Sequence, residues 1–366
     1  MDLSMVSVRR QVGSQARRSD GCDMLTSRQG SVCIKLCLEH QRGNKISMTA
    51  SSTGNLTPAN SLLFARVVRS SERVLLPINE SAERADTQLP AFYCVHSVSG
   101  AAGTDFLNLG QRLERTVRFY GLQAPPKLMQ DAQFGASIAG LADHYSNALV
   151  KFQPEGPLLI GGYCVGAIIA LDMAKKLRAM GREVGPVLAI DGAPENVAVL
   201  SAWNPRYWLD MAGNVPRWLL HADLMRTRSL RSLLWSLSKH AIAIGKGVLG
   251  MTRTQKLGGG YALDRVMDLS LYPPAQRLFI NRLYAAIFTY FTEDYPGDVV
   301  LYEANVAPLL YQPQLGRIWR KVASRSEIVG ITGTHIGIMR EPYVAALADD
   351  MRARITKFFV EAVRQP

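Results

Sequence analysis

The sequence predicts an α/β fold with a mostly parallel sheet, and three observations lead to that class. Short apolar runs typical of buried strands recur at residues 74–78, 91–95, 117–122, 157–161 and 187–190. Segments with helical spacing lie between them, and the clearest carries its apolar residues on one face from Ile138 to Phe152. Strands that alternate with helices in this way form parallel sheets flanked by those helices.

The alternation stops after Asp191 for about a hundred residues of helical pattern, and apolar runs return at residues 299–302 and 327–331. We therefore expect residues 195–296 to form a helical lid inserted into the domain. A final helix is expected from Pro342 to about Val360, since proline fits a first helical turn. Residues 1–60 lack a sustained apolar period, so we expect a flexible basic extension before one folded domain at residues 61–366.

Composition excludes several classes of protein. Apolar residues make up 48% of the 366 residues and charged residues 20%, which is the balance of a soluble globular protein. No stretch is apolar and long enough to span a membrane, and the arginine-containing start has no apolar signal region, so a cytoplasmic location is expected. Five cysteines, an odd number, argue against a disulfide framework. Cys33, Cys37 and His40 match none of the usual zinc spacings, so no metal site is expected.

The net charge of +12 is concentrated in one segment. Residues 217–256 carry eight Lys or Arg and one acid, Asp223, interleaved with Trp and Leu. This pattern is typical of amphipathic helices with a basic face. Such a face is either simply solvated or meets an acidic protein, a membrane surface or nucleic acid. We expect no nucleic-acid partner, and a peripheral membrane contact stays open.

The most informative motif is residues 162–166, which read Gly-Tyr-Cys-Val-Gly. An apolar strand pattern enters the motif and a helical pattern leaves it, as in a nucleophile elbow. The glycines permit a tight turn that exposes the sulfur at a helix N-terminus, where the helix dipole favours a thiolate. Cys164 is therefore the predicted nucleophile of an acyl-transfer site.

A thiol nucleophile needs a base and an acid that orients the base. His335 comes late in the chain, in a loop between the last predicted strand and the final helix, which is the position that the nucleophile, acid, histidine order requires. Asp191 follows the strand at residues 187–190 and is the preferred acid. Glu303, after the next strand, is the alternative.

Amide groups should stabilise the oxyanion that develops during acyl transfer. The residue after the nucleophile, Val165, should supply one amide. A second should come from the loop after the strand at residues 91–95. We predict Val98, although the sequence does not separate it from its neighbour Ser99.

These pieces together resemble the type I thioesterase domain of nonribosomal peptide and polyketide synthases, a branch of the α/β-hydrolases. The resemblance covers about four fifths of the chain. It implies an α/β-hydrolase fold with a helical lid, places the acid at Asp191, and implies no bound cofactor. The matching segments are residues 92–96 with Gly100, 120–125, 153–157, 162–166, 190–194, and His335 with residues 340–342.

The resemblance also implies the substrate: an acyl or peptidyl chain on the phosphopantetheine of an acyl or peptidyl carrier protein. We expect the chain to act on a separate carrier. Four positions depart from the family pattern: in the elbow Tyr163, Cys164 and Ala167 replace the usual Trp, Ser and Gly. Before the histidine, Thr334 stands where the family often has an acid. Because a cysteine acyl-enzyme is itself a thioester, hydrolysis, cyclisation and transfer all stay open. Two alternatives are a cysteine-dependent ester or lactone hydrolase and a non-catalytic protein that binds acyl carriers.

Overall fold

The computed structural model describes residues 33–41, 45–53, 73–85, 88–131, 137–194, 205–220, 269, 272–307 and 315–364. The chain divides into two compact units, residues 1–72 with 261–278, and residues 73–260 with 279–366. The first unit contains an antiparallel pair of strands, β1 (Cys33–Gln41) and β2 (Lys45–Thr53). The sequence predicts a flexible extension for residues 1–60, and the two strands differ from that expectation. Apolar and polar residues alternate along β1, which is the sequence pattern of a strand.

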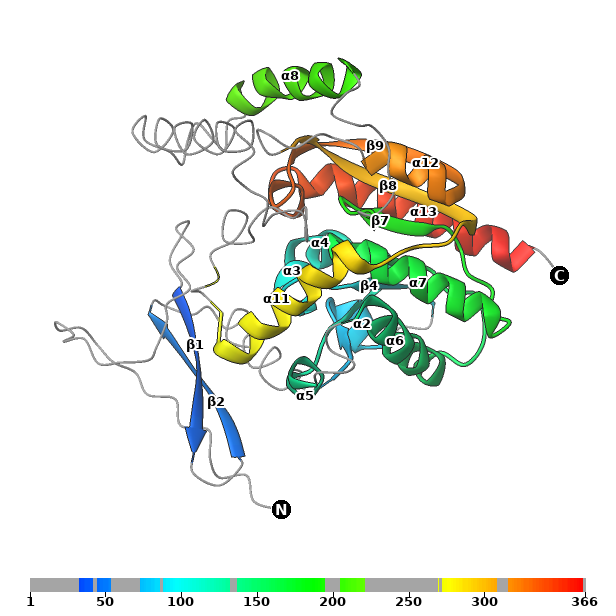
Figure 1. Ribbon diagram of the computed structural model, residues 1–366. Helices are drawn as coiled ribbons and strands as arrows, with labels where there is room; N and C mark the ends of the chain where they lie inside the picture. The colour runs from blue at the N-terminus through cyan, green and yellow to red at the C-terminus, as the bar shows by residue number, and fades with distance from the viewer. Residues whose placement is uncertain are drawn as a thin grey trace. The chain divides into compact units, whose positions relative to one another are not determined.

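The second unit is built on a sheet of seven strands in the order β3-β5-β4-β6-β7-β8-β9 (Figure 1). All neighbouring pairs are parallel except β3 with β5. The carboxyl ends of the parallel strands therefore share one edge, where sites form in such sheets. The strands are β3 (Leu75–Pro77), β4 (Ala91–Val95), β5 (Arg118–Leu122), β6 (Ile160–Tyr163), β7 (Val187–Ile190), β8 (Tyr295–Val306) and β9 (Ala323–Thr334).

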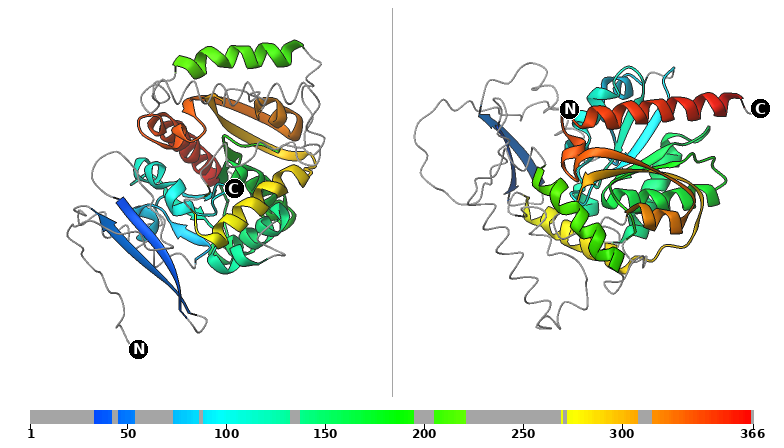
Figure 2. Two further views of the ribbon diagram at one scale, coloured as in Figure 1. Left: turned by 60° about the vertical axis from the view of Figure 1, so that its left-hand side comes forward. Right: turned by 90° about the horizontal axis from the view of Figure 1, so that it is seen from above.

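Helices cover both faces of this sheet (Figure 2). The helices α6 (Ile138–Phe152) and α7 (Val165–Ala179) pack together on one face. On the other face α4 (Leu107–Arg112) packs against α13 (Val344–Arg364). The central strands β4, β6 and β7 are buried along their whole length because both faces are covered.

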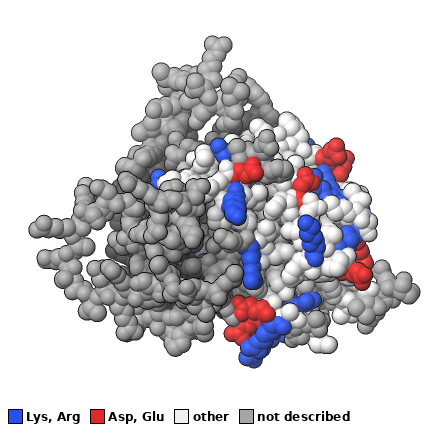
Figure 3. Space-filling model, turned by 90° about the horizontal axis from the view of Figure 1, so that it is seen from below, with Lys and Arg blue, Asp and Glu red and all other residues white. Residues whose placement is uncertain are grey.

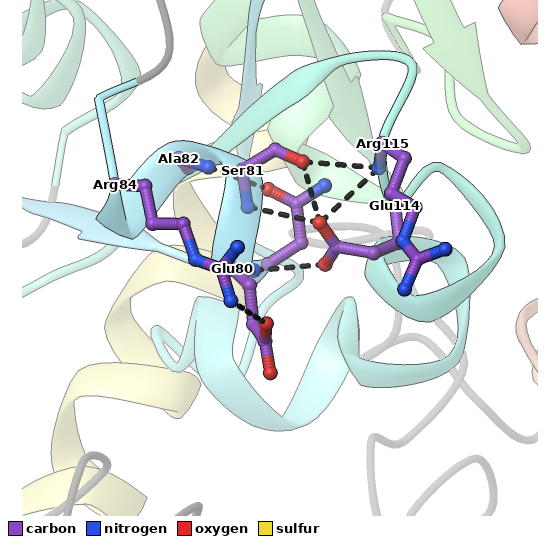
Figure 4. A network of polar contacts seen from close by, with 7 residues as sticks. Glu80, Ser81, Ala82, Arg84, Glu114 and Arg115 are labelled. Carbon is purple, nitrogen blue, oxygen red and sulfur yellow. Dashed lines mark hydrogen bonds and ion pairs between the residues drawn. The ribbon is translucent and has the colours of Figure 1, made fainter.

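Shorter helices connect these layers: α2 (Glu80–Glu83), α3 (Ala102–Asp105), α5 (Pro126–Gln130), α12 (Leu315–Val322) and the 3-10 helix η4 (Gly337–Met339). The N-terminus of helix α2 is bound by the carboxylate of a residue 34 positions away in the sequence (Figure 4). Glu114 accepts the amide protons of Glu80 at 2.8 Å and Ser81 at 2.9 Å, which satisfies two N-terminal donors of α2.

Most predicted elements are present. The strands predicted at residues 91–95 and 187–190 have the predicted bounds, and α6 begins at Ile138 as its apolar face indicated. The final helix begins at Val344 instead of Pro342, which lies in the preceding turn. Within the predicted lid the structure describes α8 (Pro205–Leu220) and α11 (Pro274–Thr289), while residues 221–268 lie outside the described part. Among the described residues, no helix is long and apolar enough to cross a membrane.

Candidate active site

The turn between β6 and α7 presents Cys164. Its backbone has φ 58° and ψ −123°, a conformation that side chains rarely adopt and that marks strain at functional turns. The flanking glycines make the turn possible: a Cβ on Gly162 would lie 2.0 Å from the Gly166 carbonyl oxygen, and one on Gly166 would lie 2.3 Å from that of Val95. The Cys164 amide donates to the carbonyl of Ile190 at 2.9 Å, which ties the elbow to β7. This is the local geometry expected of a nucleophile elbow.

The structure brings His335 and Asp191 together. Residue Asp191 follows β7 and His335 follows β9, so 144 positions separate them along the chain, yet His335 Nδ1 lies 2.7 Å from Asp191 Oδ2. The other carboxylate oxygen of Asp191 accepts the Ala304 amide proton at 2.8 Å. The carboxylate is thus fixed from β8 while it orients the imidazole.

The electrostatics of His335 favour the imidazolium. Burial alone would lower its pKa, but the neighbouring Cys164 and the hydrogen bond to Asp191 raise the pKa of His335 well above its ordinary value. Reactive cysteines occur in electropositive surroundings of this kind, beside a histidine with a raised pKa.

Tyr163 holds the histidine from another side. Its ring stacks on the imidazole with centroids 5.0 Å apart and planes 25° apart, and its hydroxyl donates to the His335 carbonyl at 2.8 Å. The sequence showed Tyr163 only as a departure from the family's Trp. The contact between residues 172 positions apart is what reveals its role.

Two further residues support the loops that carry His335 and Asp191, and no local sequence pattern reveals either role. The Thr334 hydroxyl accepts the Gly337 amide proton at 3.1 Å and so closes the turn around His335. The buried indole of Trp319 donates from Nε1 to the Gly192 carbonyl at 2.9 Å. A Cβ on Gly192 would lie 1.9 Å from the Cys164 carbonyl oxygen, so this loop packs directly against the elbow.

Glu303, the alternative acid, is placed differently. Its carboxylate accepts a backbone hydrogen bond from Gly316, and burial together with the nearby charge of Asp191 raises its pKa. Among the described hydrogen bonds, the His335 ring has Asp191 as a partner and does not have Glu303.

The loop after β4 is the predicted source of an oxyanion donor. The amides of His96, Ser97, Ser99, Gly100 and Ala101 each donate to another protein group. Of the backbone amides at residues 96–101, that of Val98 is the one for which the described hydrogen bonds contain no acceptor. It lies in a buried loop next to the α7 N-terminus, where Val165 is the first helical residue and its amide has no partner within the helix.

His96 and His144, the other histidines that the structure describes in this unit, have different partners. His96 is buried, its Nε2 lies 2.6 Å from the Tyr145 hydroxyl, and burial lowers its pKa to about 4, so it is a neutral structural residue. His144 lies on α6, and His221 and His240 lie outside the described residues. In the described part of the chain, no group of three or more His, Cys, Asp or Glu side chains could hold a metal ion.

The first four residues of the basic segment at residues 217–256 belong to α8, and Arg217 among them is exposed. The rest of the segment lies outside the described residues. On the described part of the face in Figure 3, basic and acidic side chains are intermixed. The ion pairs of the described residues include Lys176 with Asp143 at 2.7 Å and Arg84 with Glu80 at 2.9 Å.

Residues 90–230 match the family model of the thioesterase domain. A stretch of 118 residues is 32% identical to malpinin synthetase of Mortierella alpina, covering 32% of this chain and 1% of that protein. A stretch of 70 residues is 40% identical to the non-reducing polyketide synthase curS2 of Aspergillus terreus, covering 19% of this chain and 3% of that protein. The chain thus spans a very small part of the curated relatives that it matches.

Among solved structures, the NocB thioesterase domain from the nocardicin cluster aligns with a TM-score of 0.46 at 20% identity. That alignment covers 73% of this chain and 95% of that domain. The mostly parallel sheet with helices on both faces is a fold of the α/β-hydrolase type. The match to the thioesterase family model extends over residues 90–230 of the 366 residues.

Proposed function

We propose that this protein is a thioesterase or acyltransferase that forms a covalent acyl-enzyme at Cys164. His335 acts as base and acid, Asp191 orients it, and the amides of Val165 and Val98 stabilise the oxyanion. The observation that carries the proposal is the His335 to Asp191 contact of 2.7 Å next to a strained cysteine elbow. This is the nucleophile, base and orienting acid arrangement of acyl transfer.

The reaction has two steps in this proposal. The Cys164 thiolate attacks the thioester carbon, the tetrahedral oxyanion collapses, and the leaving thiol takes a proton from the His335 imidazolium. An acceptor then loses its proton to His335 and attacks the acyl group, which releases the Cys164 thiolate. Water as acceptor gives hydrolysis, an internal nucleophile gives cyclisation, and a separate amine or alcohol gives transfer.

The substrate in this proposal is an acyl or peptidyl chain on the phosphopantetheine of a carrier protein. The relatives named as synthetase and polyketide synthase support this substrate class, as does the thioesterase family match. A cysteine nucleophile suits transfer, since the acyl-cysteine remains a thioester and keeps its driving force for an amine or alcohol. Residues 61–366 would form the catalytic domain and residues 195–296 its lid.

The test is intact-protein mass spectrometry after mixing with a panel of acyl-pantetheine thioesters. We expect an acyl adduct on the parent and on Cys94→Ala, which removes a buried cysteine outside the site. The adduct should disappear in Cys164→Ala. Product analysis of the same reactions separates hydrolysis from transfer.

Other outcomes would redirect the assignment. Turnover of esters or lactones without any thioester adduct would favour the cysteine-dependent ester hydrolase. Neither adduct nor turnover, together with binding of acylated carrier protein, would favour the non-catalytic alternative. An adduct that survives in Cys164→Ala would contradict the proposed nucleophile.

A further inference from the structure

Asp105 is a part-buried acid that the proposed reaction does not use. It is the last residue of α3, directly after the loop at residues 96–101, and its side chain turns back toward that loop. The Ser97 amide donates to Asp105 Oδ2 at 2.7 Å. The Ser99 hydroxyl lies 3.4 Å from both carboxylate oxygens. The carboxylate therefore contacts the residues on either side of Val98.

The two serines extend this contact through the loop. The Ser97 hydroxyl donates to the Ser99 hydroxyl at 3.1 Å and accepts the Ser99 amide proton at 3.2 Å. The Ser99 hydroxyl also accepts the Ala101 amide proton at 3.1 Å. Through the two serine hydroxyls, these bonds hold the amides of Ser99 and Ala101, which follow Val98 in the loop.

The loop is also anchored on its other sides. His96 joins it to Tyr145 of α6 at 2.6 Å, and the Gly100 carbonyl accepts the Ala124 amide proton at 2.9 Å. A Cβ on Gly100 would lie 2.7 Å from Met129 Cε, so the loop has little room to move there. The segment between these anchors is held by Asp105.

The charge of Asp105 fits this role. Burial is the main cause that raises its pKa to about 6, opposed by the bonds from Ser97 and Ser99 and by the charge of His335. At pH 8 the group is ionised, so both oxygens accept hydrogen bonds. Its other titratable neighbours are Cys94 on β4 and Tyr163 on β6. An ionised carboxylate that is partly removed from water lowers the stability of the folded protein. Acids with pKa values perturbed in this way cluster at functional sites, which supports a functional role for Asp105.

We propose that Asp105 is a positioning residue that holds the Val98 amide in place for the oxyanion through Ser97 and Ser99. The proposal rests on the proposed acyl transfer at Cys164 and adds the residue that organises its oxyanion site. Asp105 itself touches neither the substrate nor the reacting atoms.

The test compares two reactions of the same thiol. Acylation by the acyl-pantetheine thioester that reacts fastest with the parent passes through an oxyanion. Alkylation by iodoacetamide displaces iodide from a saturated carbon and forms no oxyanion. Both rate constants are measured at pH 8 by quenched-flow mass spectrometry with peptide mapping of Cys164. The proteins are the parent, Asp105→Ala, Asp105→Asn, and the control Asp143→Asn, which removes an exposed carboxylate of α6.

In Asp105→Ala we expect the acylation rate constant to fall about 10- to 100-fold, because loss of a whole oxyanion donor costs on the order of 10²- to 10³-fold. Alkylation should change less than about 3-fold, since it needs no oxyanion donor. Asp105→Asn keeps one acceptor for the Ser97 amide and should recover most of the acylation rate. Asp143→Asn should match the parent in both reactions.

Equal losses in both reactions would overturn the proposal, because they would place the effect of Asp105 on the thiol or on the fold. Unchanged acylation in Asp105→Ala would overturn it as well. If Asp105→Ala does not fold, Ser99→Ala provides the same comparison, with a smaller selective loss of acylation expected. A parent that is alkylated at Cys164 but never acylated would contradict the proposed function, and this inference with it.

Discussion

Asp191 and Glu303 end up as neighbours with different partners. Asp191 directly follows β7, whereas Glu303 lies within the neighbouring parallel strand β8 instead of after it, and the charge of Asp191 raises the pKa of Glu303. Asp191 adopts φ 46°, an unusual backbone conformation for a residue with a side chain, and its carboxylate reaches His335. The Glu303 carboxylate instead accepts a hydrogen bond from the backbone of Gly316. Of the two carboxylates, Asp191 is therefore the one that contacts His335 and the one to which we assign the orienting role.

This assignment predicts different effects for two matched substitutions. In Asp191→Ala we expect acylation of Cys164 to fall on the order of 10²- to 10⁴-fold, because the imidazole loses the carboxylate that orients it. In Glu303→Ala we expect a change below about 5-fold, as for a group that acts only through its charge at a distance. The measurement is the rate constant for acylation by an acyl-pantetheine. The reverse ranking would transfer the orienting role to Glu303.

Among the elements, α12 stabilises the site without contributing a reacting group. It packs against β8 and β9 and buries Trp319 completely, with the indole N–H directed at the Gly192 carbonyl. Gly192 in turn contacts the Cys164 backbone. One side chain on this helix therefore links the loop after β7 to the elbow.

The substitution Trp319→Phe tests this link. It leaves the buried Gly192 carbonyl without its donor, which we expect to cost about 1–3 kcal/mol of unfolding free energy and to slow acylation. The matched control is Tyr302→Phe, which removes a hydroxyl bonded to Asp350 at 2.9 Å on the same sheet. Both variants should lower the melting temperature, and Trp319→Phe alone should slow acylation. A similar slowing in Tyr302→Phe would mean that general destabilisation is the cause.

For the whole molecule, the part-buried carboxyl of Asp105 makes the free energy of unfolding depend on pH. Its pKa of about 6 in the folded protein lies above the value of 3.8 for an ordinary aspartate. Between these pH values the folded state binds more protons than the unfolded state, so this group makes stability fall as pH rises. Above pH 6 the full cost of the ionised carboxylate is present.

Replacing Asp105 by the neutral Asn should remove this cost. We expect the free energy of unfolding of Asp105→Asn, relative to the parent, to rise between pH 4 and pH 8 by on the order of 1–3 kcal/mol. Urea unfolding of both proteins at these two pH values measures the difference. A pH-independent difference would mean that the carboxyl has an ordinary pKa, although the hydrogen bonds to Ser97 and Ser99 could still exist.

Much of the second unit could be predicted from local sequence patterns. The runs at residues 91–95 and 187–190 are apolar throughout because both faces of their strands are covered. The elbow at residues 162–166 needs glycines on both sides of Cys164, so it is visible as a short motif. The antiparallel pairing of β3 was not predictable, because a three-residue strand carries no signal of direction.

The sequence by itself determined the order of strands and helices, the elbow at Cys164 and the late position of His335, since each depends on residues close together in the chain. Only the tertiary structure decided which carboxylate meets His335, that Tyr163 stacks on it, and that Asp105 holds the loop of Val98. These contacts depend on which strands lie side by side and on the rotamers of buried side chains. Both are set by packing between segments far apart in the sequence.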